Sequence, residues 1–262
     1  MTFTIIFLLL IGLAIGSFCT FCVFRIPKNL SIIKPRSFCP SCKKQIKWFF
    51  NIPLISFIFL RGKCSFCKKK ISWVYPIIEI ITVTSLLLLY CYFETINLEY
   101  IFLSFFFISL IILFFCDLKF FLLPNVIIFP LFFIGFLRCF ISPNSIFFTS
   151  TINSVAGFLL GLGFLYFFAK AYKFIRKKEG MGMGDIKLLG ALGLWLGWKS
   201  LFFIIIISAL LGIIFGIIAI SLGKMKIQSK IPYGCFLVLS VFLYTFFINP
   251  ITSFYEKYMF LF

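Results

Sequence analysis

The chain has 262 residues, of which 63% are apolar and 12% are charged, whereas charged residues make up about 25% of an ordinary soluble domain. This composition excludes a soluble globular protein. Histidine is absent, which also excludes a histidine base, a serine-type triad and a histidine metal ligand. The net charge of +18 is typical of nucleic-acid binding. In so apolar a chain, however, basic residues serve first as membrane topology signals, and we predict no nucleic-acid partner.

Long apolar runs predict membrane spans. An apolar helix needs roughly 20 residues to cross the hydrocarbon core, and the first run is too long and too bulky for a cleaved signal peptide. The run at 186–198 is short and rich in glycine, which is typical of a closely packed helix. We therefore expect an all-α polytopic membrane protein with about eight transmembrane helices. The runs are 3–24, 77–93, 100–116, 124–141, 151–169, 186–198, 200–222 and 232–249.

The basic residues predict the orientation of the chain. Residues 25–75 contain 12 Lys and Arg and no acid, and the positive-inside rule places this segment in the cytosol. If the runs alternate across the membrane, only Arg138, Lys199 and Lys257 of the 25 basic residues fall on the opposite side. We expect both termini outside and three parts. These parts are a first helix at 1–24, a cytosolic loop at 25–75 and a membrane domain at 76–262.

Two CxxC pairs, Cys39 with Cys42 and Cys64 with Cys67, lie in this basic loop with 21 residues between them. Four thiolates at this spacing are typical of a tetrahedral structural zinc site. Two disulfides are the alternative, but cytosolic thiols are kept reduced, and nearby ammonium groups favour the thiolate form that binds metal. Because sulfur fills all four positions, the zinc is expected to fold the loop and not to catalyse. The other cysteines are interpreted as small apolar side chains: Cys19, Cys22, Cys91, Cys116, Cys139 and Cys235.

Asp117 and Asp185, the only aspartates, form the second candidate site. Asp117 ends the apolar run 101–116, Asp185 opens the run 186–198, and the alternation of spans puts both at the cytosolic membrane face. Two carboxylates in a partly dry site share a proton, so that one acts as general base on water and the other as general acid. This is the chemistry of aspartic peptide hydrolysis. The alternative is a pair of interfacial acids neutralised by Lys119 and Lys187.

The sequence around the two aspartates favours the catalytic interpretation. Gly180, Gly182 and Gly184 precede Asp185, and such a loop permits a substrate backbone to lie beside the carboxylate. The segment after Asp117 ends in Leu-Leu-Pro-Asn, where the proline suits the first turn of the next helix. A tight interfacial turn is therefore expected there.

With these motifs in this order, the chain resembles the type IV prepilin leader peptidases, membrane enzymes that cleave prepilin-like proteins and methylate the new N-terminus. The GxGD aspartate of that family falls on Asp185 and its other catalytic aspartate on Asp117. Thr20 and Cys235 stand where the family usually has Asn and Pro. The segments that carry the resemblance are Gly16-Ser-Phe18 with Arg25-Ile-Pro27, the two cysteine pairs, Asn51-Ile-Pro-Leu-Ile-Ser56, Leu60-Arg-Gly-Lys-Cys64, Ile71-Ser72, Tyr75-Pro76 with Glu79, Asp117 with Leu123-Pro-Asn125, Gly182-Met-Gly-Asp185 with Lys187-Leu-Leu189, and Ile231-Pro-Tyr-Gly234.

The resemblance implies a location, substrates and a further cofactor. The location is the bacterial inner membrane, with cleavage on its cytosolic side. The substrates are prepilin or pseudopilin precursors of type IV pilus, competence or type II secretion systems. They carry a short basic leader ending in Gly, followed by Phe or another apolar residue and a hydrophobic helix. S-adenosylmethionine is the implied methyl donor, although the chain lacks a strand, Gly-rich turn and helix fingerprint for it.

The resemblance also assigns supporting roles. Gly182, Gly184 and Lys187 are expected to support the peptidase loop. Glu79 is the acid to test for binding the substrate amine in methyl transfer. In the alternative interpretation, Glu79 is an interfacial acid paired with a loop lysine. Membrane lipids are expected partners, because anionic headgroups offset the repulsion between a basic leader and the basic loop.

Two other classes of protein are alternatives. A transporter places ionisable groups at the midplane between repeated halves, whereas these acids lie at one boundary and no repeat is visible. A zinc-loop scaffold of a pilus or secretion machine explains the four cysteines but leaves the paired aspartates without a role. The sequence therefore predicts a membrane aspartic peptidase.

Overall fold

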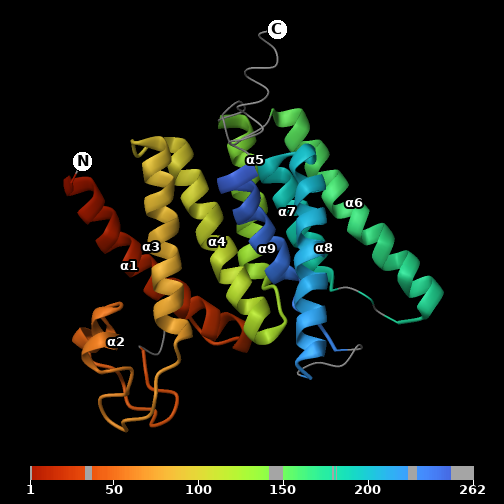
Figure 1. The fold of residues 1–262 in the computed structure, drawn as a ribbon. Coiled ribbons are helices and arrows are strands. Elements are labelled where there is room, and N and C mark those ends of the chain that lie inside the picture. Colours follow the sequence, from red (N-terminus) through yellow and green to blue (C-terminus); the bar gives the residue numbers. More distant parts are fainter. Residues whose placement is uncertain are drawn as a thin grey trace. The chain divides into compact units, whose positions relative to one another are not determined.

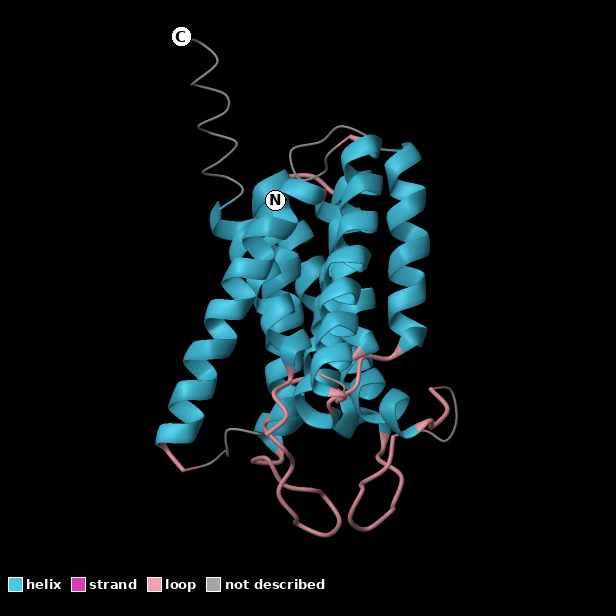
Figure 2. Ribbon diagram, turned by 90° about the vertical axis from the view of Figure 1, so that its right-hand side faces the viewer, coloured by secondary structure: helices cyan, strands magenta, loops and turns pink. Residues whose placement is uncertain are grey.

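The computed structural model describes residues 2–32, 37–141, 150–178, 180, 182–223 and 229–248. This part of the chain consists of helices and loops, and its strand-like pairings are two isolated bridges in the cysteine-rich loop (Figure 2). Two compact units are formed by Met1–Ile112 and Leu113–Phe262. Several sequence features lie outside the described residues, namely Lys34, Arg36, Lys224, Lys226, Lys257 and the end of the last predicted span at 249.

In the first unit, α1 (Thr2–Arg25) packs against α3 (Val74–Phe93), as Figure 1 shows. Gly12 and Gly16 lie on the contacting face of α1, and a Cβ atom on Gly16 would lie 2.8 Å from the Glu79 Cα. Small residues four positions apart permit two helices to approach this closely. The chain between the two helices forms the cysteine-rich loop, which contains 3₁₀ turns at Ile26–Lys28 and Trp48–Asn51 and the short α2 (Ile55–Phe59).

The second unit is organised around α7 (Met183–Leu196), in which every residue from Leu188 to Leu196 is buried. The unit begins inside α4 (Leu98–Phe120). Within the described residues, α7 packs most extensively on four helices, and a π-helical stretch at Tyr244–Ile248 follows the last of them (Figure 1). They are α5 (Asn125–Ile141), α6 (Thr151–Arg176), α8 (Trp198–Ser221) and α9 (Tyr233–Leu243).

Backbone-to-backbone packing holds α7 against α6. A Cβ atom on Gly157 would strike the carbonyl oxygen of Gly193, and one on Gly161 would lie 2.6 Å from the carbonyl oxygen of Leu189. Against α5, the Trp195 indole N–H donates to the carbonyl of Leu131 at 2.9 Å. The helix that carries Asp185 is therefore fixed from two sides.

The lengths of the helices fit a polytopic membrane protein. Among the described residues, five helices, α1, α3, α4, α6 and α8, are long and apolar enough to cross a membrane, and Asn125–Ile141 and Tyr233–Phe247 are shorter apolar helices. The 14 residues of α7 rise about 21 Å, which is less than the roughly 30 Å hydrocarbon core. The predicted all-α membrane class is confirmed, and the count of eight spans stays a prediction.

Candidate functional site

The two aspartates of the second unit meet at the ends of two helices. Asp117 lies in the last turn of α4 and is 5% exposed. Asp185 is the third residue of α7, which begins at Met183 within the glycine-rich segment. The two carboxyl groups interact electrostatically. The fold therefore brings together the two acids that the sequence singled out.

The turn into α9 closes a third side of this site. The backbone N–H of Cys235 donates to Asp117 Oδ2 at 3.0 Å, and the N–H of Gly234 faces both carboxyl groups. A Cβ atom on Gly234 would lie 3.0 Å from Asp117 Oδ2 and 3.0 Å from Leu123 Cδ1. Only glycine leaves room for the carboxylate at this position.

The short connection from α4 to α5 completes the site. Phe121 has a positive φ of 52°, and α5 begins at Asn125, directly after Pro124. The side chain of Leu123 lies between Gly184 and Gly234, since a Cβ atom on Gly184 would be 2.9 Å from the Leu123 Cβ. The tight turn predicted after Asp117 is confirmed.

The residues expected to support the peptidase loop lie around Asp185. A Cβ atom on Gly182 would lie 3.3 Å from Asp185 Oδ2, so the loop backbone passes close to the carboxylate. Lys187, which would neutralise Asp185 in the alternative interpretation, donates from Nζ to Asn125 Oδ1 at 3.0 Å. Its ammonium also lies 5.7 Å from the centre of the Phe129 ring. Lys187 thus joins α7 to the start of α5.

The four cysteines of the two CxxC pairs converge in the first unit. The Sγ atoms of Cys39, Cys42, Cys64 and Cys67 lie within 4.8 Å of one another, and Cys39 and Cys67 are 3.9 Å apart. A tetrahedral zinc ion with Zn–S bonds of about 2.3 Å requires sulfur atoms about 3.8 Å apart. The cluster therefore matches the geometry of a structural zinc site.

The two CxxC pairs form nearly identical hairpin-like turns. The N–H of Cys39 donates to Lys44 O and the N–H of Lys43 donates to Cys39 O, at 3.0 and 2.8 Å. The second turn repeats this pattern between Cys64, Lys68 and Lys69, with positive φ at Lys43 and Lys68. In both turns, local hydrogen bonds thus set the positions of the two cysteines.

The pKa values of the cysteine thiols in the cluster are also consistent with binding of a cation. Burial alone would raise the pKa of Cys39, but the backbone N–H groups of Cys42 and Ser41, together with the side chains of Cys64 and Cys42, lower the pKa to about 6. The N–H of Lys69 favours the Cys67 thiolate, yet loss of solvent around the thiol and the three neighbouring sulfur atoms together raise the pKa of Cys67 to about 11. Four thiolates at this distance need a metal cation to balance their charge.

Glu79 is buried on α3, with 8% of its surface exposed, next to Gly16 of α1. Its Oε2 accepts the backbone N–H of Leu54 at 2.8 Å, where the alternative interpretation expected a loop lysine. Leu54 has φ 56° and ψ −49°, and Ile55 N–H donates to Pro53 O across it. This is the strained form of the γ-turn. Glu79 therefore anchors a strained turn of the cysteine-rich loop to the helix pair.

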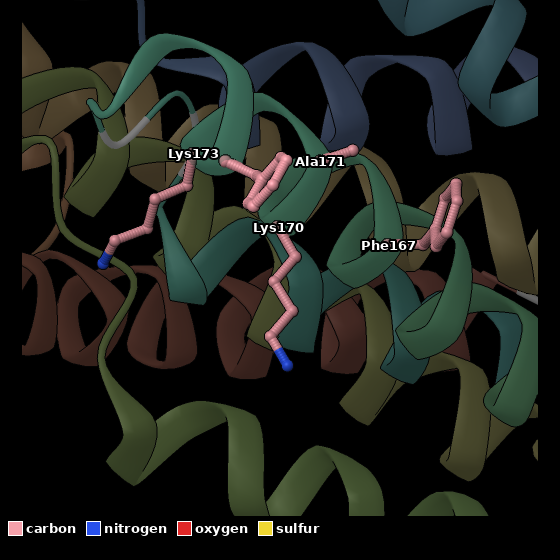
Figure 3. A pocket seen from close by; sticks show the side chains of 5 residues that line it. Phe167, Lys170, Ala171 and Lys173 are labelled. Atoms are coloured by element: carbon pink, nitrogen blue, oxygen red, sulfur yellow. The ribbon is translucent and has the colours of Figure 1, made fainter.

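Two pockets of the second unit lie along α6. One of about 470 Å³ is lined by Phe167, Lys170, Ala171, Lys173 and Phe174, and Figure 3 shows these side chains along the helix. The other, of about 520 Å³, lies among α5, α6 and α7. Neither is lined by Asp117 or Asp185.

Two groups that contact the aspartates or α7 have no site role in the sequence-based predictions. The first is the backbone of Gly234 and Cys235. The motif Ile231-Pro-Tyr-Gly234 is the sequence feature from which a role of this turn could have been predicted. The second is Arg138, which is fully buried and donates to Trp195 O at 3.3 Å and to Ser154 Oγ at 3.0 Å. Arg138 thereby satisfies a carbonyl in the last turn of α7, where no intrahelical donor is available.

The fold and the site define a class of protein. It is a helical membrane protein that pairs two carboxylates at the ends of two helices and carries a separate four-cysteine cluster. Residues 10–93 match the bacterial peptidase A24 N-terminal domain, and residues 104–217 match the type IV leader peptidase family. The first match contains the cysteine cluster and Glu79, and the second contains both aspartates. The chain belongs to the type IV leader peptidase family.

Curated relatives carry the name prepilin leader peptidase/N-methyltransferase. The protein of Aeromonas salmonicida is 32% identical over 228 residues, covering 87% of this chain and 77% of the relative. That of Klebsiella pneumoniae is 34% identical over 201 residues, covering 74% and 86%. That of Pseudomonas aeruginosa is 29% identical over 256 residues, covering 88% and 86%. No solved structure matches the chain. These names favour an enzyme over a scaffold without peptidase activity.

Proposed function

We propose that Asp117 and Asp185 are the catalytic pair of an aspartic endopeptidase that removes the basic leader of prepilin-like precursors. The chain is a leader peptidase and N-methyltransferase of the inner membrane. One observation carries the catalytic assignment: the two carboxyl groups interact in a single site, on different helices, beside the backbone N–H groups of Gly234 and Cys235. Two like charges held together favour the state in which they share one proton.

Hydrolysis follows from that shared proton. The ionised carboxylate takes a proton from a water molecule, whose oxygen forms a bond to the carbonyl carbon of the scissile peptide. The protonated carboxyl gives its proton to the leaving nitrogen, and the C–N bond breaks. The leader becomes a carboxylic acid that loses its proton to solvent, the mature protein gains a free amine, and the pair again holds one proton. Gly182, which has no side chain and lies beside Asp185 Oδ2, is proposed to leave room for the substrate backbone next to that carboxylate.

Cys39, Cys42, Cys64 and Cys67 are proposed to hold one structural zinc ion. When bound, the ion supplies charge balance and ties the two turns of the loop together. The four sulfur atoms leave no open coordination position, so the hydrolytic water is activated by the aspartates alone. The segment between the cysteines has few apolar residues with which to form a core of its own, so its fold is proposed to depend on the bound ion.

The second activity is proposed to transfer a methyl group to the newly exposed amine. S-adenosylmethionine, when bound, supplies that methyl group. The described residues contain no strand leading into a Gly-rich turn of the kind that binds nucleotides. Glu79 is the proposed site for the amine, because it is a buried carboxylate held in place by Leu54 at the boundary between α3 and the loop.

The arrangement in the membrane is also proposed. The basic loop at 25–75 lies in the cytosol, Asp117 and Asp185 face the same side, and the three parts of the chain are 1–24, 25–75 and 76–262. Anionic lipid headgroups lie between the basic leader of a prepilin or pseudopilin precursor and the basic loop.

The direct test uses purified protein and a synthetic prepilin-like peptide with a basic leader, a glycine and an apolar segment. Mass spectrometry should show cleavage after the glycine, and, with S-adenosylmethionine present, addition of one methyl group to the new N-terminus. A chain with both Asp117→Asn and Asp185→Asn is the matched control. An intact peptide with the wild-type protein would favour the scaffold alternative.

A further inference from the structure

The short helix α2 of the cysteine-rich loop has one exposed apolar face. Ile55, Ile58 and Phe59 are 60%, 74% and 83% exposed. They are spaced by three and four residues and therefore share one face of the helix. On the other side, Ser56 is buried and its hydroxyl donates to the carbonyl of Phe49 at 3.1 Å. The outer face of α2 is thus apolar, although it belongs to a segment with 12 Lys and Arg and no acid.

The contacts of α2 place it at the first turns of α3. Leu54, the residue before α2, donates its backbone N–H to Glu79 Oε2 at 2.8 Å, and Glu79 is the sixth residue of α3. The ring of Phe57 lies 5.0 Å from that of Trp73, which directly precedes α3. Figure 1 shows α2 beside this end of α3, whereas other parts of the cysteine-rich loop extend past it.

This end of α3 marks a boundary of the hydrocarbon core. The 20 residues of α3 rise about 30 Å, which matches the thickness of the core, so the first turn reaches the boundary when the helix crosses the membrane. Glu79 lies about 7.5 Å along the helix axis from the first residue. Trp73 is exposed, and tryptophan is enriched at the level of the lipid headgroups. α2 is therefore held at the depth of the headgroups.

We propose that α2 attaches the cysteine-rich loop to an anionic lipid surface by inserting Ile55, Ile58 and Phe59 among the headgroups. The inference goes beyond the proposed function and does not depend on the aspartate pair. In an interfacial segment, insertion of apolar side chains and attraction to anionic lipids act together. The attachment keeps the four-cysteine cluster beside the membrane surface.

Charge favours lipid over another protein segment as the occupant of this face. Lys47, Arg61 and Lys63 flank α2 in the chain and are exposed. A second copy of this chain would bring the same basic loop, with no acid at 25–75, so that the two loops would repel each other. The basic leader of the proposed precursor is repelled in the same way. Anionic headgroups match both the positive charge and the apolar face.

The test replaces Phe59 by the photoreactive p-benzoylphenylalanine in the full chain, reconstituted in vesicles of phosphatidylglycerol and phosphatidylcholine in equal parts. After irradiation, mass spectrometry of the peptides should show phosphatidylglycerol attached at position 59. The same replacement of Phe66 is the matched control, because Phe66 is also an exposed phenylalanine of the loop but lies in the second cysteine turn.

The yields of the lipid adducts decide the outcome. About tenfold more lipid is expected at position 59 than at position 66, because only the side chain on α2 is inserted. In vesicles of phosphatidylcholine alone, the yield at position 59 should fall by about threefold or more, because the attraction to anionic headgroups is lost. Equal yields at the two positions or in the two kinds of vesicle would overturn the proposal. So would an adduct at position 59 that joins it to a second chain or to an added precursor peptide.

A double substitution tests the same contact without a photoreactive group. Ile58→Gln with Phe59→Gln removes the two most exposed apolar side chains of α2, and Gln keeps a high helix propensity. Amide hydrogen exchange of the loop in the mixed vesicles should accelerate by about tenfold, because the loop is released from the surface. Phe66→Gln is the control and should keep exchange within about twofold of wild type. Wild-type exchange in the double variant would contradict the attachment.

Discussion

The cysteine cluster and the aspartate site are built by opposite means. The cluster arises from two short turns whose hydrogen bonds close within a few residues, such as Cys39 with Lys44 and Cys64 with Lys69. The aspartate site is assembled from α4, α7 and α9, and its bond from Cys235 to Asp117 joins residues 118 positions apart. Local geometry prepares the first site, whereas helix packing alone prepares the second.

This difference predicts which substitutions disrupt each site. The cluster depends on ligand identity and metal, because without a cation four sulfur atoms within 4.8 Å of one another carry unfavourable charge. The aspartate site depends on the close approach of helix backbones. Gly234 and Gly193 lie at such contacts, where a Cβ atom would meet a neighbouring segment. Removal of a ligand should therefore damage chiefly the first site, and added bulk should damage the second.

The largest expected effect is that of the catalytic acids. Asp117→Asn and Asp185→Asn should each lower kcat for leader cleavage by roughly 10²- to 10⁴-fold or more, because Asn keeps the size of Asp and loses proton transfer. Zinc content, measured by elemental analysis of the same samples, should stay at the wild-type level, since the cluster is built independently. Full cleavage by either variant would remove that residue from catalysis.

The next effect concerns the metal. Wild-type protein should contain about one zinc per chain, and Cys64→Ser should lose it, because removal of one thiolate breaks a four-ligand shell. Residues 36–72 should then become sensitive to protease, methyl transfer should fall, and peptide hydrolysis should be reduced but retained. Cys91→Ser, at an exposed cysteine outside the cluster, is the matched control. Complete loss of hydrolysis in a Cys64→Ser protein with intact spans would mean that the loop helps to build the peptidase site.

A smaller effect tests the packing of α7. Gly193→Ala places a Cβ atom against the carbonyl oxygen of Gly157 and 2.9 Å from Leu201 Cδ1. Such overpacking costs about 1–3 kcal/mol and should lower both the melting temperature and kcat, as α7 shifts with Asp185. Gly163→Ala on α6 is the control, because a Cβ atom there meets nothing within 4 Å. Equal behaviour of the two variants would show that the contact between α6 and α7 does not position the site.

The smallest expected effect is that of serine-directed reagents. Acylating agents that modify active-site serines should leave cleavage unchanged, because a chain without histidine lacks the usual base for activating a hydroxyl. Peptide cleavage is measured after preincubation with the reagent, and a serine peptidase treated in parallel verifies its potency. Inhibition that maps to a single modified serine would contradict the aspartic mechanism.

The sequence determined much of both sites through composition and spacing. Apolar runs of span length predicted the helical membrane class, and two CxxC pairs predicted a four-sulfur cluster that the structure contains. The scarcity of acids singled out Asp117, Asp185 and Glu79. These signals are local, because a helix, a metal-binding turn or a glycine-rich loop is encoded by residues close together in the chain.

Only the tertiary structure decided which groups surround these residues. It assigned Leu54 as the partner of Glu79, Asn125 as the partner of Lys187, and the backbone of Cys235 as the donor to Asp117. The physical reason lies in the helices themselves. An amphipathic helix reveals its inner face by a polar stripe on the other side, whereas these helices are apolar all round. Which faces meet is then decided by glycine contacts and buried hydrogen bonds between distant segments, as in the backbone contact of Gly157 with Gly193.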